Sequence, residues 1–550
     1  MIASIVLTGV AVLVAGYFIY GRLVEGWLGL DPQRPTPAHT MTDGVDYMPT
    51  SPAVLMGHHF SSIAGAGPIV GPVIAAAAFG WLPAVVWIVL GSVLIGGVQD
   101  FAALAASLRH GARSVAEIAR EEISPFARTL FLVFVWLALV YVIVVFVDLT
   151  SATFTHDPGV ASSSLMYILM AVALGLLVHR AGVRLSRASA VFVPLVFLAI
   201  GAGQALPLPL PLDNPAPAWN LLLLGYCLVA SVLPVWLLLQ PRDFLSSFLL
   251  YACLGGGVLG VIFGGGAMDP EVVPLPAFAG WTDANLGLLF PAMFITIACG
   301  ACSGFHSIVA SGTTAKQLAN EAHARPVAYG GMLLEGVLAL LSVSAVVLVG
   351  AQAAGGMAPT LVFSQGLGRI LAALGLPQAM GARFAALAIS TFLLTTLDTC
   401  TRLARYVLEE LLALPRGRKG PALAATLATL ALPALLTQIT LHLPDGTPAP
   451  AWKVIWPVFG ATNQLLGALA MLAITIWLRH RGRRHAFVAV PMLFMFGVTL
   501  VALAQLAWRY TPLTLVGAIA AALFVLALVL AGEAVRRVLV RVPRSSSASR

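Results

Sequence analysis

The chain has 550 residues, of which 59% are hydrophobic and only 9% are charged. A soluble globular protein contains about 45–50% apolar and about 25% charged residues, so this composition excludes a soluble enzyme and a nucleic-acid-binding protein. Because the apolar runs are continuous and do not alternate, the sequence predicts an all-α integral membrane protein and not a β-barrel. The net charge of +8 should then reflect the loops that face the cytoplasm.

Fifteen segments are apolar enough to cross a bilayer, which takes roughly 20 residues each. We interpret the first as a retained helix and not a signal peptide, because it lacks a basic leading region and an evident cleavage site. Outside the spans, 114–122 is expected to form a short interfacial helix, and 364–374 another short helix. The fifteen segments lie at approximately 2–20, 54–80, 82–106, 129–148, 163–179, 188–206, 220–240, 244–266, 287–312, 327–350, 381–408, 422–442, 453–478, 486–508 and 513–533.

The basic residues indicate the orientation of these spans. If the N-terminus is outside and the spans alternate, all but four of the 30 Lys and Arg residues fall in inside segments, and Arg242 is counted among them. Cytoplasmic loops carry such an excess. We therefore expect a periplasmic N-terminus, a cytoplasmic C-terminus and a disordered basic cytoplasmic tail over 536–550. The four exceptions are Arg369, Arg383, Lys453 and Arg509.

The second span contains a concentration of helix-breaking residues. Three glycines and two prolines lie within 65–72, which makes an uninterrupted helix improbable. A new half-helix beginning near Pro68 would direct its N-terminal dipole at an anion such as a carboxylate. The alternative is a kink that serves only helix packing. The candidate substrate-binding residues on this stretch are His58, His59, Ser61, Ser62, Gly65 and Gly67.

Two further spans show weaker signs of a break. Residues 296–314 are mostly small or hydroxyl-bearing and include Ser303, His306 and Ser307, which we expect to bind substrate or a cation. A small-residue helix interface is an equally good interpretation. Residues 229–234 end in Pro234, with Tyr226 and Ser231 as candidate binding residues. A plain proline kink is the alternative there.

Charged residues inside membrane spans are costly and usually functional. Asp100, Glu335, Asp398 and Arg402 lie within predicted spans, and we expect them to take part in ion coupling, since a buried carboxylate can carry a proton. Asp398 and Arg402 are four residues apart on one helix face, which favours a structural ion pair between them. For Asp100 and Glu335, the alternative is a buried hydrogen-bonded carboxyl group.

A metal or redox site is an alternative role for the histidines and cysteines. The five cysteines are odd in number and lie in apolar segments, so no disulfide framework is expected, and Cys299 and Cys302 are best explained as small core residues. His58, His59 and His306 show no metal-ligand spacing, and proton relay or substrate hydrogen bonding suits them better. We expect no metal, no cofactor and no catalytic residue.

Several motifs resemble the carbon starvation protein A (CstA) family of bacterial inner-membrane transporters. The resemblance covers nearly the whole chain, and its longest motif is highly specific. It implies peptide uptake during nutrient limitation or, for some members, pyruvate uptake with protons. The motifs are GHHFSSIAGAGPIVGPVIAA from Gly57, GGVQDF from Gly96, ACGACSGFHSIVASGTTAKQ from Ala298, LTTLDTCTRLARY from Leu394 and WPVFGATNQLL from Trp456.

The resemblance also implies a fold, that of the amino acid–polyamine–organocation superfamily. Its core consists of two inverted repeats of five helices with discontinuous helices 1 and 6. We assign core helices 1, 6, 8 and 10 to the second, seventh, ninth and eleventh spans. The expected organisation is an N-terminal extra helix and loop (1–53), the transport core (54–412), extra C-terminal spans (413–535) and the tail (536–550).

Together these features predict a secondary active transporter that works by alternating access. It would import a short peptide or pyruvate with a proton or sodium ion, in contact with membrane lipids and without nucleic acid. The sequence leaves the oligomeric state open. The alternatives are a membrane-embedded starvation sensor, an intramembrane metal-dependent hydrolase, which would lack an H-E-x-x-H pattern, and a channel.

Overall fold

The computed structural model describes most of the chain as helix, and every predicted span contains helical residues. The described residues are 2–43, 47–234, 236–264, 272–351, 356–414, 419–443, 446–510 and 514–540. Most of the predicted tail lies outside these ranges. The first half contains α1 (Ile2–Phe18), α2 (Tyr20–Leu28), α3 (Pro37–Thr40), α4 (Pro52–Ile63), α5 (Gly67–Phe79), α6 (Trp81–Gly91), η1 (Ser92–Gly96), α7 (Gly97–Arg109), α8 (Val115–Glu122), α9 (Pro125–His156), α10 (Pro158–His179), α11 (Leu185–Ala205), α12 (Ala216–Val232) and α13 (Leu239–Ile262).

The second half begins with a two-stranded hairpin and has a second one before α22. Its elements are β1 (Thr282–Asp283), β2 (Gly287–Leu288), α14 (Leu289–Thr296), α15 (Gly304–Val309), η2 (Ala310–Thr314), α16 (Ala315–Gln317), η3 (Glu321–His323), η4 (Arg325–Gly330), α17 (Gly331–Val349), α19 (Pro359–Ala372), α20 (Gln378–Leu411), α21 (Lys419–Leu436), β3 (Leu441–His442), β4 (Pro448–Ala449), α22 (Ala451–His480), α23 (Ala486–Arg509) and α24 (Leu515–Val540).

The fifteen predicted spans each coincide with a helix or an interrupted helix. In the described ranges, 11 helices are long and apolar enough to cross a membrane, or up to 12 if the bent pair α4–α5 counts as one span. This confirms a multi-pass all-α membrane protein. Fifteen crossings remain a prediction, because α12 and α21 are shorter and the ninth predicted span is divided into α14 and α15. The two short helices expected at 114–122 and 364–374 are α8 and α19.

Local sequence signals explain where several helices start. Ser114, Ser124 and Asp157 each accept a hydrogen bond from a backbone N–H in the first turn of α8, α9 and α10. Such caps satisfy donors that have no partner within the helix. Pro125 and Pro158 follow two of these caps at the first helical position, where a missing N–H costs nothing.

The helices form two successive series with the same order of elements. Each series begins with a broken span (α4–α5 or α14–α15) and continues with an interrupted helix (α6–η1–α7 or η4–α17) and a short helix (α8 or α19). A helix of more than 30 residues follows (α9 with 32 or α20 with 34), and two further helices close the series (α12 and α13, or α21 and α22). From the start of the first series to the start of the second there are seven segments: α4–α5, α6–α7, α9, α10, α11, α12 and α13. Because this number is odd, the second series is inverted relative to the first if each segment crosses the membrane once.

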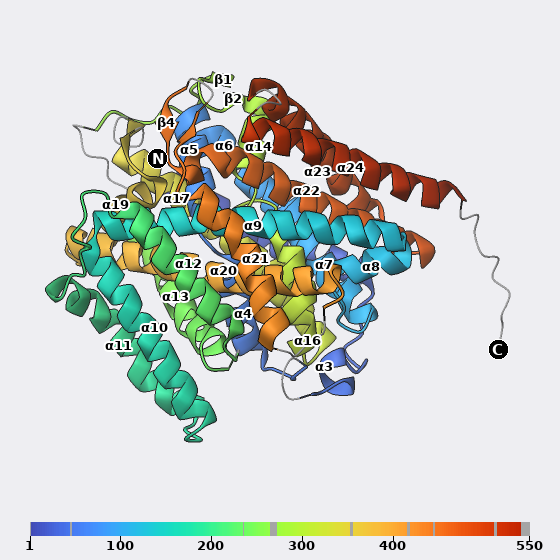
Figure 1. Cartoon of the computed structure of the whole chain (residues 1–550), viewed down its shortest axis with the longest axis horizontal. Coiled ribbons are helices and arrows are strands. Elements are labelled where there is room, and N and C mark those ends of the chain that lie inside the picture. Colours follow the sequence, from blue (N-terminus) through green and yellow to red (C-terminus); the bar gives the residue numbers. More distant parts are fainter. Residues whose placement is uncertain are drawn as a thin grey trace.

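Packing follows the same repeat. Helix α13 packs against α4 in the first series, and α22 packs against α15 in the second. The long helices α9 and α20 pack against each other through the middle of the molecule, where Figure 1 shows them crossing the view (Figure 1). The hairpin α10–α11 has no counterpart in the second series and lies at the edge of the molecule (Figure 1).

The position of the second broken span corrects a prediction. Core helix 6 was expected in the seventh span, with a break at 229–234. Instead, α12 ends at Val232, Pro234 lies in the connection, and α13 begins at Leu239. The break is therefore the turn between two helices. The extra hairpin α10–α11 moves the start of the second repeat two segments further along the chain, to α14–α15.

The predicted location of Arg242 was also wrong. It was counted with the basic residues of a cytoplasmic loop, but it lies one turn inside α13 with no exposed surface. Because α13 begins at Leu239, immediately after the short connection, the helix carries this arginine into the protein interior.

Candidate functional site

Two broken spans cross in the centre of the protein. Helices α4 and α5 meet at a 44° bend, with Ala64, Gly65 and Ala66 between them. Helix α14 ends at Thr296 and α15 begins at Gly304, so the residues between them are also outside regular helix. Helix ends inside a membrane present N–H and C=O groups that have no partner within the helix, and such groups can hold a polar solute.

Small residues allow the two breaks to touch. A Cβ added at Gly67 would come within 2.4 Å of Cys299, and one at Gly71 within 2.3 Å of the Thr296 carbonyl oxygen. Real Cβ atoms do not approach so closely, so glycine is required at both positions. Gly65 faces Thr396 of α20 and Phe146 of α9 in the same way. The glycine-rich stretch therefore serves packing at the crossing as well as the break itself.

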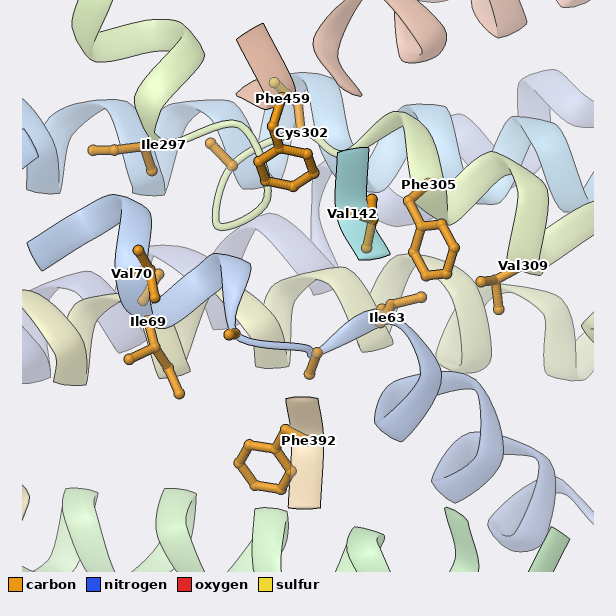
Figure 2. Packing of buried hydrophobic residues seen from close by; sticks show 14 of the residues in the cluster. Ile63, Ile69, Val70, Val142, Ile297, Cys302, Phe305, Val309, Phe392 and Phe459 are labelled. Atoms are coloured by element: carbon orange, nitrogen blue, oxygen red, sulfur yellow. The ribbon is translucent and has the colours of Figure 1, made fainter. Parts of the chain in front are cut away.

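Apolar side chains surround the crossing on all sides. Figure 2 shows Ile63, Ile69 and Val70 on either side of the first break, with Val142 of α9, Phe392 of α20 and Phe459 of α22 around it (Figure 2). All six side chains are buried. A polar solute at this point would be enclosed by apolar walls, as is usual in binding sites for small molecules.

One buried polar chain joins both broken spans, and we call it the His59 network (Thr314, His59, Asp100, His306 and Glu335). His59 Nδ1 lies 2.8 Å from Thr314 Oγ1, and His59 Nε2 lies 3.0 Å from Asp100 Oδ2. His306 Nδ1 is 3.8 Å from the same Asp100 oxygen, and His306 Nε2 is 2.9 Å from Glu335 Oε2. All five residues are at most 1% exposed.

The network contains residues of both series of helices. Each repeat contributes one histidine from its broken span, in α4 or α15, and one carboxylate from the following helix, in α7 or α17. Both oxygens of Glu335 and both ring nitrogens of His306 lack hydrogen-bond geometry within the described part of the chain. Buried polar groups are normally hydrogen-bonded, so such exceptions point to a functional site.

The neighbouring histidine belongs to a second chain, which we call the His58 network (His58, Asp243, Arg242, Asp398 and Tyr226). His58 Nδ1 lies 3.3 Å from Asp243 Oδ2, and Arg242 Nη2 lies 3.6 Å from Asp243 Oδ1. Arg242 Nη1 donates to Asp398 and, at 2.7 Å, to the Tyr226 hydroxyl. The Tyr226 hydroxyl donates to Asp398 at 2.8 Å.

Asp398 therefore has a different partner from the one predicted. The expected ion pair with Arg402 is not formed, because Asp398 faces Arg242 of α13. Arg402 instead donates to the carbonyl oxygens of Ala230 and Leu233, at 2.8 and 2.7 Å, at the end of α12. Helical spacing placed Asp398 and Arg402 on one face, but the exposed carbonyls of α12 and a fully buried arginine compete for them.

Each predicted serine has a hydrogen bond inside the protein, and four of the five lie at the two breaks. Ser61 and Ser62 donate to the His58 carbonyl, at 3.2 and 2.7 Å. Ser231 donates to the Leu228 carbonyl and contacts Thr426 of α21, so it lies away from the crossing. Ser303 and Ser307 belong to the second break, together with His306.

Two amide side chains that the candidate residues did not include hold the second break. Asn463 of α22 accepts from the Phe305 N–H at 3.0 Å and from the Ser303 hydroxyl, and it donates to Cys299 Sγ. Gln99 of α7 donates to the Ser303 carbonyl and the Ser307 hydroxyl. Both amides lie within the quoted motifs GGVQDF and WPVFGATNQLL, which is the only signal that could have found them.

The three histidines considered for a metal site do not surround a common point. His58 and His59 are adjacent on α4 but face different carboxylates, Asp243 and Asp100. Among the residues that the structure describes, no three His, Cys, Asp or Glu side chains are arranged to hold a metal ion.

A cavity of about 220 Å³ adjoins the His58 network. It lies between the start of α4, α10 and the start of α13. His58, Gln240, Pro241 and Phe244 are among its lining residues. The His58 side chain is 15% exposed, whereas Arg242 and Asp243 behind it are at most 1% exposed. The second network is thus closer to solvent than the first.

Comparison with known proteins supplies the family. The family model for carbon starvation protein CstA matches residues 1–360 and 349–502. The chain belongs to this family. It is 35% identical to the peptide transporter CstA of Escherichia coli over 90% of this chain and 80% of that protein. It is 31% identical to the pyruvate/proton symporter BtsT of the same organism, over 86% of this chain and 76% of that one.

A solved structure shares the fold. The manganese transporter of Eremococcus coleocola, crystallised with an aromatic bis-isothiourea compound, aligns with a TM-score of 0.51 at 13% sequence identity. The alignment covers 91% of this chain and 98% of that one. The predicted membership of the CstA family and the predicted class of membrane fold are both confirmed.

Proposed function

We propose that this protein is a secondary active transporter that imports a short peptide or pyruvate with protons across the bacterial inner membrane. The observation that carries this proposal is the His59 network. It is buried in the centre of the protein and ties both broken spans to α7 and α17. A network of this kind allows a proton to change the force between the moving parts of an alternating-access carrier.

The relatives support the substrate class. Proteins named peptide transporter and pyruvate/proton symporter share 31–35% identity with most of the chain. Short peptides and pyruvate both carry a carboxylate and are small enough for a buried site. The family description also names carbon starvation, so we place the uptake under nutrient limitation.

Protons suit the buried networks better than sodium ions. Imidazole groups exchange protons near neutral pH, and carboxyl groups do so where burial raises their pKa. A sodium site would instead be built from several oxygen ligands. In the His59 network the two carboxylates face imidazole nitrogens, so Asp100 and Glu335 are the proposed proton-binding residues, with His59 and His306 between them.

The proposed orientation places the α8 end of the bundle in the cytoplasm. Basic residues gather there in ion pairs that join separate elements: Arg109 with Glu321, Arg128 with Glu410 and Arg325 with Glu25. An excess of basic residues is typical of the cytoplasmic side. This orientation keeps the prediction of a periplasmic N-terminus and a cytoplasmic C-terminus.

The repeat also suggests a revised extent of the transport core. Helices α21 and α22 occupy the places that α12 and α13 have in the first series, and α22 contributes Asn463 to the second break. We therefore extend the proposed core to α22. The hairpin α10–α11, the first span and helices α23 and α24 are then additions to it.

Uptake into proteoliposomes tests the proposed function. Purified protein is reconstituted, and labelled alanyl-alanine or pyruvate is offered with an inward proton gradient, an inward sodium gradient or no gradient. We expect accumulation above equilibrium with the proton gradient and its loss on adding a protonophore. Equilibration without accumulation would indicate a channel, and recovery of free alanine would indicate a hydrolase. If no substrate enters the proteoliposomes, the alternative of a membrane-embedded starvation sensor would be favoured.

A further inference from the structure

We propose that Arg242 is the binding site for the substrate's carboxylate, and that Asp243 takes up one proton when the carboxylate binds. This inference rests on the proposed function and names the residue that recognises the substrate class. It concerns Arg242 and Asp243, two members of the His58 network that were not predicted to bind substrate.

Arg242 is fixed on one edge and unoccupied on the other. Its Nη1 donates to Asp398 and Tyr226, and the Tyr167 hydroxyl donates to its backbone carbonyl at 2.5 Å. Its Nε and Nη2 have no hydrogen-bond partner within the described residues, although the side chain has no exposed surface. Nε and Nη2 are the pair of parallel donors with which a guanidinium binds a carboxylate in bidentate fashion.

Asp243 is the group that a substrate would replace. Its Oδ1 lies 3.6 Å from Arg242 Nη2, which is too long for a hydrogen bond, and neither of its oxygens has a hydrogen-bond partner among the described residues. It sits beside Arg242 as a weakly held counter-charge. An arriving carboxylate with two short hydrogen bonds to Arg242 would be the better partner.

Access and size agree with a small carboxylate. The cavity of about 220 Å³ is lined by Gln240, Pro241 and Phe244, the residues on α13 that flank Arg242 and Asp243. His58 lies between this cavity and Asp243. A largely apolar cavity with a few polar groups is typical of small-molecule sites.

Charge balance requires the proton. Arg242 carries one positive charge, and Asp398 and Asp243 each carry a negative charge. Arg402 of α20 is a second positive charge that acts on Arg242. The other titratable groups that face them are His58 of α4, Tyr167 of α10, and Tyr226 and Cys227 of α12. A substrate anion adds a negative charge to this buried group, which costs several kcal/mol unless it is neutralised.

The transfer itself is simple. A hydronium ion in the cavity gives its proton to His58, and His58 passes it across the 3.3 Å contact to Asp243. The products are water, a neutral Asp243 carboxyl group and the substrate carboxylate paired with Arg242. The charge of the network is the same before and after binding, so the proton and the anion enter together.

Binding to the purified full chain tests the inference. Alanyl-alanine, its C-terminal amide and pyruvate are titrated calorimetrically in weak buffer with a pH indicator. The parent should bind both carboxylates, take up about one proton for each and bind the amide at least tenfold more weakly. Asp243→Asn should bind both carboxylates without proton uptake.

The double variant Arg242→Gln/Asp398→Asn removes the guanidinium without leaving a buried carboxylate unpaired, and its folding is checked by thermal unfolding. It should lose carboxylate binding at least tenfold, while the matched control Arg405→Gln, on the same helix as Asp398, should not. Unchanged carboxylate affinity in the folded double variant would overturn the inference, and so would a parent that binds neither carboxylate. A parent that binds them but fails to accumulate them would overturn the proposed transport alone.

Discussion

Two adjacent histidines on α4 lead into two networks of different character. The His59 network is sealed, contains no permanent cation and joins both broken spans. The His58 network contains Arg242, which stays charged, and reaches a cavity. Imidazole and carboxylate groups change their charge by exchanging protons, whereas an arginine stays positively charged and can bind an anion. If both proposals hold, helix α4 connects the residues that bind the proton with those that bind the substrate.

The strongest test of this division is the variant Asp100→Asn. Asp100 contacts both histidines of the His59 network, so an amide at this position should remove the proposed proton-dependent change in the contacts between the two broken spans. We expect accumulation of pyruvate or alanyl-alanine to fall by about tenfold or more, since an amide cannot bind the proposed proton and the coupling between two sites is typically about 5–150-fold. Exchange of labelled for unlabelled substrate without a gradient should persist.

The controls for this prediction are Asp243→Asn and the exposed Asp213→Asn. Asp213→Asn should leave accumulation unchanged, because its side chain is exposed between α11 and α12. Proton uptake on substrate binding should survive in Asp100→Asn and disappear in Asp243→Asn. If Asp100→Asn instead abolishes binding-linked proton uptake, the two networks are not separate.

Stability should also distinguish the two histidines. His59→Ala removes hydrogen bonds to Thr314 and Asp100 and leaves Asp100 buried without its imidazole. We expect a loss of about 3 kcal/mol in the free energy of unfolding, compared with about 1 kcal/mol for the partly exposed His58→Ala. Chemical or thermal unfolding in detergent measures both. Equal losses would mean that burial and partners do not separate the two positions.

The sequence predicted the first half of this site better than the second. Histidines, glycines and prolines on one short stretch marked the break at 57–72, because the conformational preferences of Gly and Pro are local. The partners of that stretch are far away in the chain. Arg242 resembled a loop residue at the end of an apolar run, and only tertiary packing shows that α13 carries it inside.

Core helix 6 was assigned to the wrong span for a similar reason, although a break was also predicted within 296–314. Pro234 gave a visible signal in the seventh span, while the real second break at 297–303 has no proline and few residues that forbid a helix. It is held open by Gln99 and Asn463 from other helices. An inserted hairpin, α10–α11, also shifted the count of core helices, and hydropathy alone does not distinguish an inserted helix from a core helix.

Hydroxyl groups at the ends of the two networks allow a finer comparison. Thr314 bonds His59 at 2.8 Å, and Tyr226 bonds both Asp398 and Arg242. Thr314→Val should shift the pH dependence of uptake, because His59 loses the group that orients its ring. Tyr226→Phe should raise the KM for a carboxylate substrate by about threefold to tenfold, since the net contribution of one hydrogen bond is about 0.5–1.5 kcal/mol. A pH shift in Tyr226→Phe with an unchanged KM would exchange the proposed roles.

A third histidine network lies outside the membrane spans and shows how such groups behave near solvent. His110 Nε2 lies 3.3 Å from Glu122, which also contacts His480 at 2.7 Å, and Glu121 and Arg113 are close by. Burial lowers the pKa of His110, but the hydrogen bonds to Glu122 and the Ala106 carbonyl and the nearby negative charges raise it further, so the net pKa is raised. For Glu122, burial raises the pKa, while the bonds and charges of the two histidines lower it more, so the net pKa is lowered.

These two pKa shifts determine the pH range in which the contacts of Glu122 with His110 and His480 stabilise the protein. The Glu122 carboxyl group, whose pKa is lowered in the folded protein, stabilises the fold above its ordinary pKa of 4.5. This stabilisation is lost as the pH falls through the pKa of the folded state. The His110 imidazole, whose pKa is raised in the folded protein, stabilises the fold fully below its ordinary pKa of 6.5. This stabilisation is lost as the pH rises through the pKa of the folded state. The difference in unfolding temperature between the parent and Glu122→Gln should therefore be largest between these two pH values and smaller at pH about 8, by an amount equivalent to about 1 kcal/mol. A difference that grows steadily toward alkaline pH would contradict the charged imidazole, and with it the premise that histidine–carboxylate pairs in this protein exchange protons in the physiological range.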